Sequence, residues 1–241
     1  MIDSAKAIAS CVEATSGQYE AITHNLANTS TVGYKRVQAV FMSAGADPSA
    51  PGGGSGSGII GKSFIDFTQG NLIQTGRPLD MALRGPGFFV LETPKGQLYT
   101  RNGTFQTNAE GQLVDTAGRT VAGTNGPLIV PRNAATSSIN VTSDGRLMAG
   151  GLEVGRLKIV EFEKPEVLKP VGQCAFEGPA KPAPAEATKT TVSQGYQEGS
   201  NVNAVDELVG LITASRLYEA NIKAIQTSSE RGKSVLAVAM G

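Results

Sequence analysis

The sequence has no tryptophan, few aromatic residues and no excess of either charge. Among 241 residues, aromatic side chains make up 5%, and 21 Lys and Arg residues balance 21 Asp and Glu residues. Nucleic-acid-binding domains usually carry a basic excess, so the zero net charge argues against nucleic acid as a partner. With so few aromatic rings, any core has to be built mostly from Val, Ile, Leu and Ala side chains.

Cysteine and histidine are too scarce for most of the sites that need them. The two cysteines, Cys11 and Cys174, cannot form a disulfide framework. We interpret them as unpaired, with a single bridge between them left open. A zinc site needs several clustered Cys or His residues, and a catalytic triad would depend on His24 alone. We therefore expect no metal, no cofactor and no enzymatic activity.

Long apolar runs are also missing. No segment approaches the roughly 18 consecutive apolar residues that a membrane-spanning helix requires. Residues 1–16 include Asp3 and Glu13, and they lack the basic start and apolar run of a secretory signal peptide. We expect a chain that is not membrane-embedded, and that is either cytoplasmic or exported without a cleaved signal peptide.

Both ends of the chain carry apolar and small residues at alternating steps of four and three. This spacing places them on one stripe of a helix, the pattern that a coiled coil buries. We expect two long helices, from about Ile2 to about Ala27 and over residues 200–241, packed together as a coiled coil. The stripe positions are Met1, Ala5, Ile8, Val12, Thr15, Tyr19, Ile22 and Leu26 at one end, and Ala204, Leu208, Leu211, Ser215, Tyr218, Ile222, Ile225, Ser229, Gly232, Leu236 and Ala239 at the other.

The middle of the chain reads as an antiparallel, loop-rich β domain. Short alternating apolar segments are separated there by turns rich in Gly, Asn and Asp, and we place this domain at residues 62–177. A Gly/Ser-rich linker at 43–61 precedes it, and a Pro/Ala-rich tether and connector at 178–199 follow it. Residues 1–42, an N-terminal helix with an extended segment, would join residues 200–241 in a helical assembly domain. The predicted fold class is α+β.

Two features invite an enzymatic interpretation and are rejected. Residues Gly56 to Ser63 formally match a phosphate-binding loop, but no strand precedes them and the following residues are typical of a strand, not a helix. Several carboxylates fall in or beside predicted turns, where solvated side chains are far more common than catalytic ones. These are Asp66, Asp80, Asp115 and Asp144. We expect no small-molecule substrate.

Several local strings resemble those of bacterial flagellar basal-body rod and hook proteins. They are NLANTSTVGYK at 25–35, TGRPLDMAL at 75–83, GPGFFV at 85–90, YTRNGTF at 99–105, GQLV at 111–114, EGSNVN at 198–203 and RLYEAN at 216–221. The resemblance covers both ends of the chain and much of its middle. Within the family, the chain is most similar to the proximal rod proteins, with the distal rod proteins second.

The resemblance implies a structural subunit of the flagellar rod without catalytic activity. Members of this family leave the cell uncleaved through the flagellar type III export apparatus, enter the periplasm and stack helically into a hollow drive shaft. That shaft transmits torque from the motor to the hook. The implied partners are further copies of the chain, proximal and distal rod subunits and the export apparatus. An oligomeric extracellular interaction module is the less favoured alternative.

We expect the assembly interface to combine stripe residues with residues of the two motifs that flank the helices. It comprises Ile8, Val12, Tyr19, Ile22, Leu26, Asn28, Gly33, Tyr34, Asn201, Val202, Leu208, Leu211, Ile212, Tyr218, Ile222 and Ile225.

Overall fold

The chain divides into two compact units, which we name the helical unit and the β unit. A computed structural model describes residues 2–43, 59–131, 138–179 and 184–240, with the side chains of 2–9, 41–43, 59–61, 228–229 and 231–240 left out. The helical unit comprises Met1–Ala27, Val37–Ile65 and Asn203–Gly241, and the β unit comprises Asn28–Arg36 and Asp66–Val202. Most of the Gly/Ser-rich linker, residues 44–58, and residues 180–183 of the Pro/Ala-rich tether lie outside the described residues.

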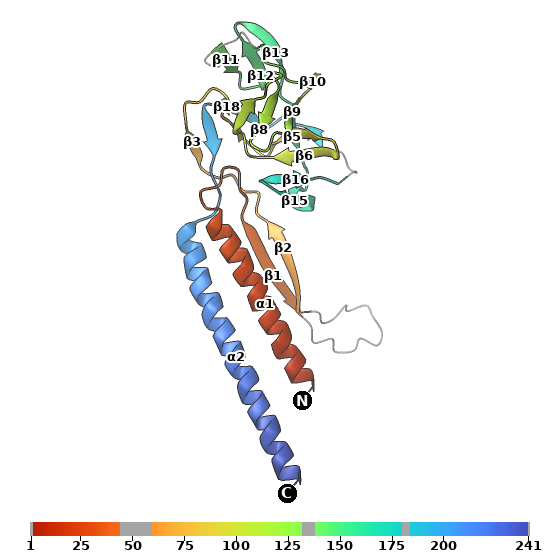
Figure 1. The fold of residues 1–241 in the computed structure, drawn as a ribbon, viewed down its shortest axis with the longest axis vertical. Coiled ribbons are helices and arrows are strands. Elements are labelled where there is room, and N and C mark those ends of the chain that lie inside the picture. The colour runs from red at the N-terminus through yellow and green to blue at the C-terminus, as the bar shows by residue number, and fades with distance from the viewer. Residues whose placement is uncertain (1, 44–58, 132–137, 180–183, 241) are drawn as a thin grey trace. The chain divides into compact units, whose positions relative to one another are not determined.

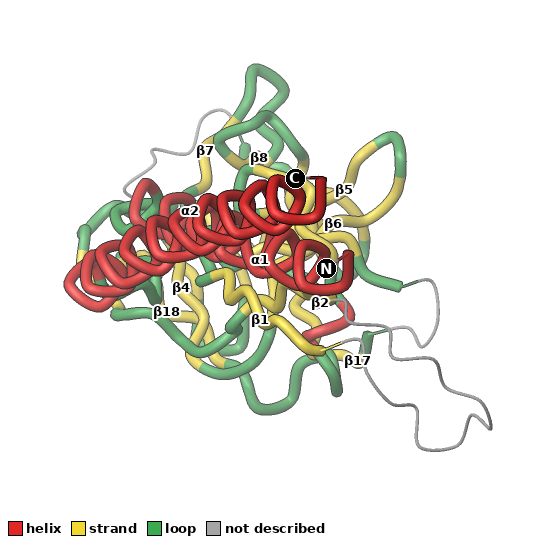
Figure 2. The backbone as a smooth tube through the Cα atoms, turned by 90° about the horizontal axis from the view of Figure 1, so that it is seen from below, coloured by secondary structure: helices red, strands yellow, loops and turns green. Residues whose placement is uncertain are grey.

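The helical unit contains two α-helices and a β-hairpin. Helix α1 spans Ile2–Ala27 and helix α2 spans Ala204–Met240, while strands β1 (Val37–Ser43) and β2 (Ile59–Ile65) pair antiparallel. The two helices lie side by side, with the hairpin next to α1 (Figures 1 and 2). The start of α2 has a capping side chain, because the Val205 N–H donates to Asn203 Oδ1 at 3.0 Å.

Helix α1 is held to its neighbours through a small number of buried groups. Ile22 is buried and faces Gly210 of α2, where an added Cβ would lie 3.4 Å from Ile22 Cδ1. Asn221 Nδ2 donates to Thr15 Oγ1 at 3.2 Å. On the hairpin side, the Asn25 amide donates to the Val37 carbonyl and accepts from the Val37 N–H, both at 2.8 Å. A buried amide thus pairs with both backbone groups of Val37, the first residue of β1.

The expected fold class, α+β with terminal helices packed as a coiled coil, is wrong. In the described part of the chain two α-helices stand against 19 strands in antiparallel pairs, so the protein is β-rich. The shared buried seam of a coiled coil is not formed either, because Tyr19, Leu208, Tyr218 and Ile225 stay exposed. The apolar residues of α2 are distributed around the helix, and one neighbouring helix covers only one side of it.

The β unit is built around a ten-stranded antiparallel sheet. Its main path runs β15-β16-β6-β5-β9-β8-β7, with β10 beside β9 and β14 between β5 and β17. These strands are β5 (Phe88–Thr93), β6 (Gly96–Thr100), β7 (Phe105–Thr107), β8 (Leu113–Asp115), β9 (Thr120–Gly123), β10 (Gly126–Pro127), β14 (Ile159–Glu161), β15 (Lys169–Gly172), β16 (Ala175–Glu177) and β17 (Ala185–Glu186).

Three smaller sheets complete the β unit. One orders β11 (Ile139–Val141), β12 (Arg146–Ala149) and β13 (Leu152–Arg156), and a 3-10 turn covers Pro165–Val167. In the other two, strands from far along the chain return to early ones. Strand β18 (Thr191–Gln194) pairs with β4 (Met81–Arg84), and β19 (Tyr196–Glu198) pairs with β3 (Leu72–Gln74).

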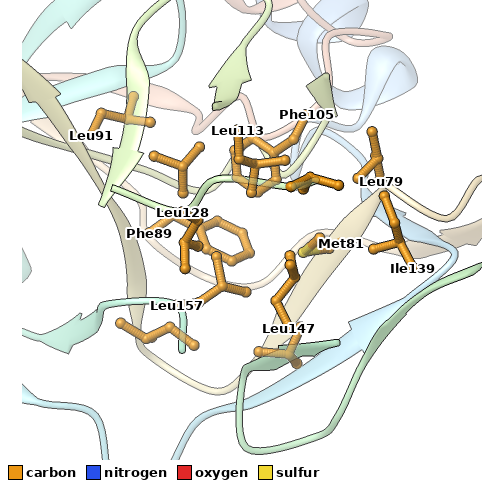
Figure 3. Packing of buried hydrophobic residues seen from close by; sticks show 14 of the residues in the cluster. Leu79, Met81, Phe89, Leu91, Phe105, Leu113, Leu128, Ile139, Leu147 and Leu157 are labelled. Atoms are coloured by element: carbon orange, nitrogen blue, oxygen red, sulfur yellow. The ribbon is translucent and has the colours of Figure 1, made fainter. Parts of the chain in front are cut away.

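The hydrophobic core of the β unit lies where the large sheet meets β4, β12 and β18. Figure 3 shows Phe89 and Phe105 close together, and their rings meet edge to face at 5.1 Å between centroids. Leu, Val, Ile and Met side chains fill the rest of this cluster, including Val192 from β18. Strand β18, near the C-terminal end of the β unit, is therefore part of the core, because it both extends a sheet and buries an apolar side chain.

Candidate assembly site

The residues expected to form the assembly interface divide into three groups in the structure. Ile22 is buried against α2, and Val12, Leu26, Leu211 and Ile222 are partly buried. Tyr19, Leu208, Ile212, Tyr218 and Ile225 are exposed, whereas Asn28, Gly33, Tyr34, Asn201 and Val202 belong to the β unit. The side chain of Ile8 lies outside the described residues. The set therefore includes both exposed and buried residues, and its role in assembly stays a prediction.

Helix α2 presents an apolar face that sequence analysis identified only in part. At 3.6 residues per turn, Val205, Leu208, Val209 and Ile212 lie on one side of the helix, opposite Glu207 and Ala214. Glu207 and Ala214 are buried, but Val205, Val209 and Ile212 are 66%, 60% and 56% exposed. Val205 and Val209 were missed because the steps of four and three followed a single stripe. This exposed apolar face of α2 is the group of residues best placed to meet another protein.

Residues 28–36, which follow α1, form a tight loop that belongs to the β unit. Thr31 donates from its backbone N–H to the Asn28 carbonyl at 3.1 Å and from Oγ1 to Asn28 Oδ1 at 3.0 Å. Gly33 has a φ of +71°, and a Cβ added there would lie 2.5 Å from the backbone nitrogen of Asn102. Glycine is required here both by the left-handed backbone conformation and by the close approach.

Asn201 joins three segments of the β unit through hydrogen bonds. Its Oδ1 accepts from the Arg36 N–H at 2.7 Å, and its Nδ2 donates to the Asp66 carbonyl at 2.8 Å. Oγ1 of Thr68 lies 3.0 Å from the same Nδ2. The neighbouring Val202 is partly buried, and its N–H donates to Ser200 Oγ at 3.2 Å. Asn201 is thus a positioning residue inside the β unit.

Beside Asn201 lie three buried charges, which we name the junction cluster: Lys35, Arg101 and Glu198. Nζ of Lys35 is 2.6 Å from Glu198 Oε1, and NH1 of Arg101 is 3.5 Å from Glu198 Oε2. The exposed fractions of the three side chains are 0%, 2% and 0%, in that order. Two cations therefore share one carboxylate in an environment without bulk water.

Each member of the junction cluster has further polar partners. Lys35 Nζ donates to the Thr68 carbonyl at 2.7 Å, and Glu198 Oε1 also accepts from the Gly70 N–H at 3.0 Å. Arg101 donates from NH2 to the Gly85 carbonyl at 2.7 Å, and its guanidinium carbon lies 4.9 Å from the centre of the Phe88 ring. These contacts replace part of the water that the charged groups lose on burial, although Arg101 Nε is buried without a hydrogen-bond partner.

Burial dominates the titration of the two cations. It lowers the pKa of Lys35, and the attraction of Glu198 offsets this lowering only in part, while the like charge of Arg101 adds to it. The pKa of Arg101 is also lowered by burial, against the attraction of Glu198 and Glu161. The cluster is thus short of negative charge, which makes Glu198 its most important member.

The sequence did not predict the junction cluster, although all three of its residues lie in motifs that carry the family resemblance. Lys35 ends the string NLANTSTVGYK, Arg101 lies in YTRNGTF and Glu198 opens EGSNVN. Sequence spacing carries no signal that residues 35, 101 and 198 meet. The expectation of solvated turn carboxylates was also wrong for Asp80 and Asp115, which are buried. Asp80 Oδ2 accepts from Thr75 Oγ1 at 2.7 Å, and Asp115 Oδ2 lies 2.6 Å from Arg119.

The motif considered for phosphate binding lies partly outside the described residues, because positions 56–58 are among those left out. Lys62 lies within β2 opposite Val40, so no loop and helix follow a strand as a phosphate-binding loop requires. Cys11 and Cys174 are free, and they lie in different units. In the described part of the chain, no group of three Cys, His, Asp or Glu side chains is placed to hold a metal ion, and no described helix has the length and apolar composition to span a membrane.

Two family models match the chain. Residues 82–149 match the D1 domain of the flagellar hook protein FlgE/F/G, and residues 193–238 match the C-terminal part of the flagellar basal body rod FlgEFG protein. The first match covers much of the ten-stranded sheet. The second begins in β18 and includes Glu198, the exposed apolar face of α2 and most of that helix.

Whole-chain comparisons agree with these two matches. The flagellar basal-body rod protein FlgG of Agrobacterium fabrum is 36% identical, over 91% of this chain and 92% of that protein. The rod protein FlgF of Caulobacter vibrioides is 31% identical, over 91% and 90%. FlgF of Mesorhizobium japonicum is 30% identical, over 98% and 97%. With this similarity across almost its whole length, the chain belongs to the family of flagellar basal-body rod proteins.

Proposed function

We propose that this structural rod protein assembles helically, through the exposed apolar face of α2, into the hollow shaft that transmits torque from the flagellar motor to the hook. The single observation that carries the proposal is the exposure of Val205, Val209 and Ile212 on one side of a helix whose other side is buried. In water such a face is costly, and burying it against neighbouring subunits would favour assembly. The partners would be further copies of this chain and other rod subunits.

Within the rod, we place the chain in the proximal part. FlgF of Mesorhizobium japonicum matches it from end to end, over 98% of one chain and 97% of the other, so the two proteins are almost equal in length. A distal position is the alternative, because FlgG of Agrobacterium fabrum is the more identical relative at 36%. Export through the flagellar type III apparatus and a location in the periplasm belong to the same proposal.

The assembly proposal is tested by adding one charge to the exposed face of α2. Ile212→Asp replaces an exposed side chain, so the purified variant should unfold within a few degrees of the wild-type Tm, while rod formation and swimming are lost. Thr213→Asp places the same charge at the adjacent exposed position, and it should retain motility. Normal swimming of the Ile212→Asp strain would show that this face is not the interface.

The position along the rod is tested in a strain that lacks this chain. If it is a proximal subunit, isolated basal bodies should lack both it and the distal rod proteins. If it is the distal subunit, proximal rod proteins should remain attached. Protein composition of the purified basal bodies separates the two outcomes.

A further inference from the structure

Glu198 is the shared counter-ion of two buried cations, and these three residues come from distant parts of the chain. Lys35 lies in the loop after α1, Arg101 follows β6, and Glu198 ends β19. Lys35 and Glu198 are separated by 163 positions. Glu198 belongs to the last strand before α2, so it is the final member of the cluster in chain order.

The same cluster holds together three segments that we name the junction segments: residues 28–36, 66–71 and 195–202. The Gly33 N–H donates to the Glu198 carbonyl at 2.7 Å, and the Gly199 N–H donates to the Asn71 carbonyl at 2.8 Å. Each segment adjoins a point where the chain passes between the two units, at 27/28, 36/37, 65/66 and 202/203. The cluster thus connects, within the β unit, the three segments that adjoin these four boundaries in sequence.

The buried charges make it unfavourable for residues 28–36 and 66–71 to pack on the β unit before β19 does. If residues 28–36 and 66–71 packed onto the β unit without β19, Lys35 and Arg101 would both be buried without the Glu198 carboxylate. Burying unpaired ions is strongly unfavourable, and the two like charges would also repel each other. Arrival of Glu198 supplies the counter-charge and two acceptor oxygens at once.

We propose that Glu198 makes the closing of the junction segments conditional on the C-terminal segment of the β unit. Until residues 191–202 dock, residues 28–36 and 66–71 do not pack stably on the β unit. When residues 191–202 dock, they bring the third junction segment with them, and all three segments close together. The device acts within the subunit itself, and it goes beyond the proposed role of the exposed face of α2 in assembly. It predicts that the three cluster members are unequal, with Glu198 more important than either cation.

An ordinary ion pair makes the opposite prediction, namely that removing either partner has a similar effect. Removal of Lys35 leaves a balanced pair, Arg101 with Glu198. The acceptors of Lys35 also keep partners, because Asn201 Nδ2 lies 3.2 Å from the Thr68 carbonyl and the Gly70 N–H still donates to Glu198. Removal of the Glu198 charge leaves two cations that keep only the attraction of Asp66 on Lys35 and of Glu161 on Arg101, each weaker than that of Glu198.

The test compares four full-length variants by amide hydrogen exchange: Glu198→Gln, Lys35→Met, the double variant Lys35→Met/Glu198→Gln, and the control Glu177→Gln. Glu177 lies on β16 and is exposed. The measured quantity is the exchange rate of the junction segments relative to that of β5 in the core.

We expect Glu198→Gln to speed exchange of all three junction segments together, by roughly a hundredfold or more. Lys35→Met and Glu177→Gln should change it by less than about tenfold, and the double variant should return to near the rate of Lys35→Met, because one cation has been removed with the anion. Should Glu198→Gln fail to fold while the double variant folds, the conclusion is the same.

Three results would overturn the proposal. They are an effect of Lys35→Met as large as that of Glu198→Gln, a double variant that is no better than Glu198→Gln alone, and exchange in Glu198→Gln that matches the control.

Discussion

At the scale of single residues, the packing of the β unit depends on a few residues with specific backbone or hydrogen-bonding roles. Gly33 and Asn201 shape the junction segments, and the buried charges of Lys35, Arg101 and Glu198 connect them to the rest of the β unit. None of these residues performs chemistry on a substrate. Their role is to position backbone, and this suits a protein whose activity is to hold its shape in an assembly.

Gly33→Ala should destabilise the β unit far more than an alanine at another left-handed glycine. Its Cβ would overlap the Asn102 backbone, whereas Gly118, with φ +80°, has nothing within 4 Å of an added Cβ. We expect a loss of about 3 kcal/mol or more for Gly33→Ala and about 1 kcal/mol for Gly118→Ala. Denaturant unfolding measures both, and equal losses would show that residues 28–36 are loosely held.

Lys35 should make stability depend on alkaline pH. Its pKa in the folded protein lies below the ordinary value of 10.5, so between these two values the unfolded chain binds more protons than the folded one. The free energy of unfolding therefore increases as pH rises from the folded pKa to the unfolded pKa of Lys35. Below the folded pKa this stabilising contribution is absent. Glu198, Arg101 and Asp66 act on this lysine.

The measurement for Lys35 is the difference in unfolding free energy between wild type and Lys35→Met from pH 7 to pH 10.5. The wild type should gain relative to the variant as pH increases. Groups titrating in both proteins, including Tyr99 and Cys174 with their raised pKa values, cancel in the difference. A flat or falling difference would contradict the lowered pKa.

At the scale of elements, α2 has two different faces. One side packs on α1 through Ala214 and Gly210, and the opposite side carries the exposed apolar face. Strand β18 has a comparable double role, since it extends β4 and supplies Val192 to the core. An element with two such faces shows no single clean periodicity, because apolar residues fall on both of its sides.

Ile22→Asp should disrupt the contact between α1 and α2. Ile22 is 7% exposed, so the new carboxylate would be buried without a designed partner, at a cost of about 3 kcal/mol or more. Tyr19→Asp places the same charge on the same helix at a side chain that is 44% exposed, and it should be nearly neutral. Circular dichroism during denaturation compares the two, and similar midpoints would argue against the helix contact.

The side chain of Gln194, on β18, forms hydrogen bonds to β11 of the three-stranded sheet. Its Nε2 donates to the Pro78 and Ile139 carbonyls, both at 2.8 Å, and its Oε1 accepts from the Val141 N–H at 3.0 Å. Gln194→Leu leaves three backbone groups without this partner, so we expect a loss of about 2–4 kcal/mol and faster exchange at Val141. The exposed Gln97→Leu on β6 is the control, and an equal effect there would refute the role of Gln194.

At the scale of the whole molecule, the packing contacts are divided between the two units. The large hydrophobic cluster draws all its members from residues 79–192, inside the β unit, while the helical unit depends on contacts between α1, α2 and the hairpin. A rod subunit built this way can offer its helices to neighbours while its β unit keeps an independent fold.

Calorimetry of the monomer should therefore resolve two unfolding transitions. The transition of the helical unit should move to lower temperature in Ile22→Asp, while that of the β unit should stay within a few degrees of wild type, because the hydrophobic cluster of the β unit has no member among the described residues of the helical unit. A single transition that shifts as a whole would mean that the two units unfold cooperatively.

The sequence by itself determined the protein family and the positions of many turns. Local strings such as NLANTSTVGYK are visible without a structure, and helix α1 ends at Ala27, directly before the polar run that was expected to break it. These features depend on neighbouring residues, whose backbone preferences and side-chain caps act over a few positions. The coiled coil was a wrong prediction, because periodicity shows that a face is apolar but not what covers it.

Only the tertiary structure decided which residues meet. It assigned residues 28–36 to the β unit, returned β18 and β19 to β4 and β3, and brought Lys35 and Arg101 to Glu198. It also divided the expected interface into buried, exposed and junction residues. The physical reason is that burial and charge pairing are properties of the packed chain: Lys35 and Glu198, 163 positions apart, become partners only when the strands between them have folded.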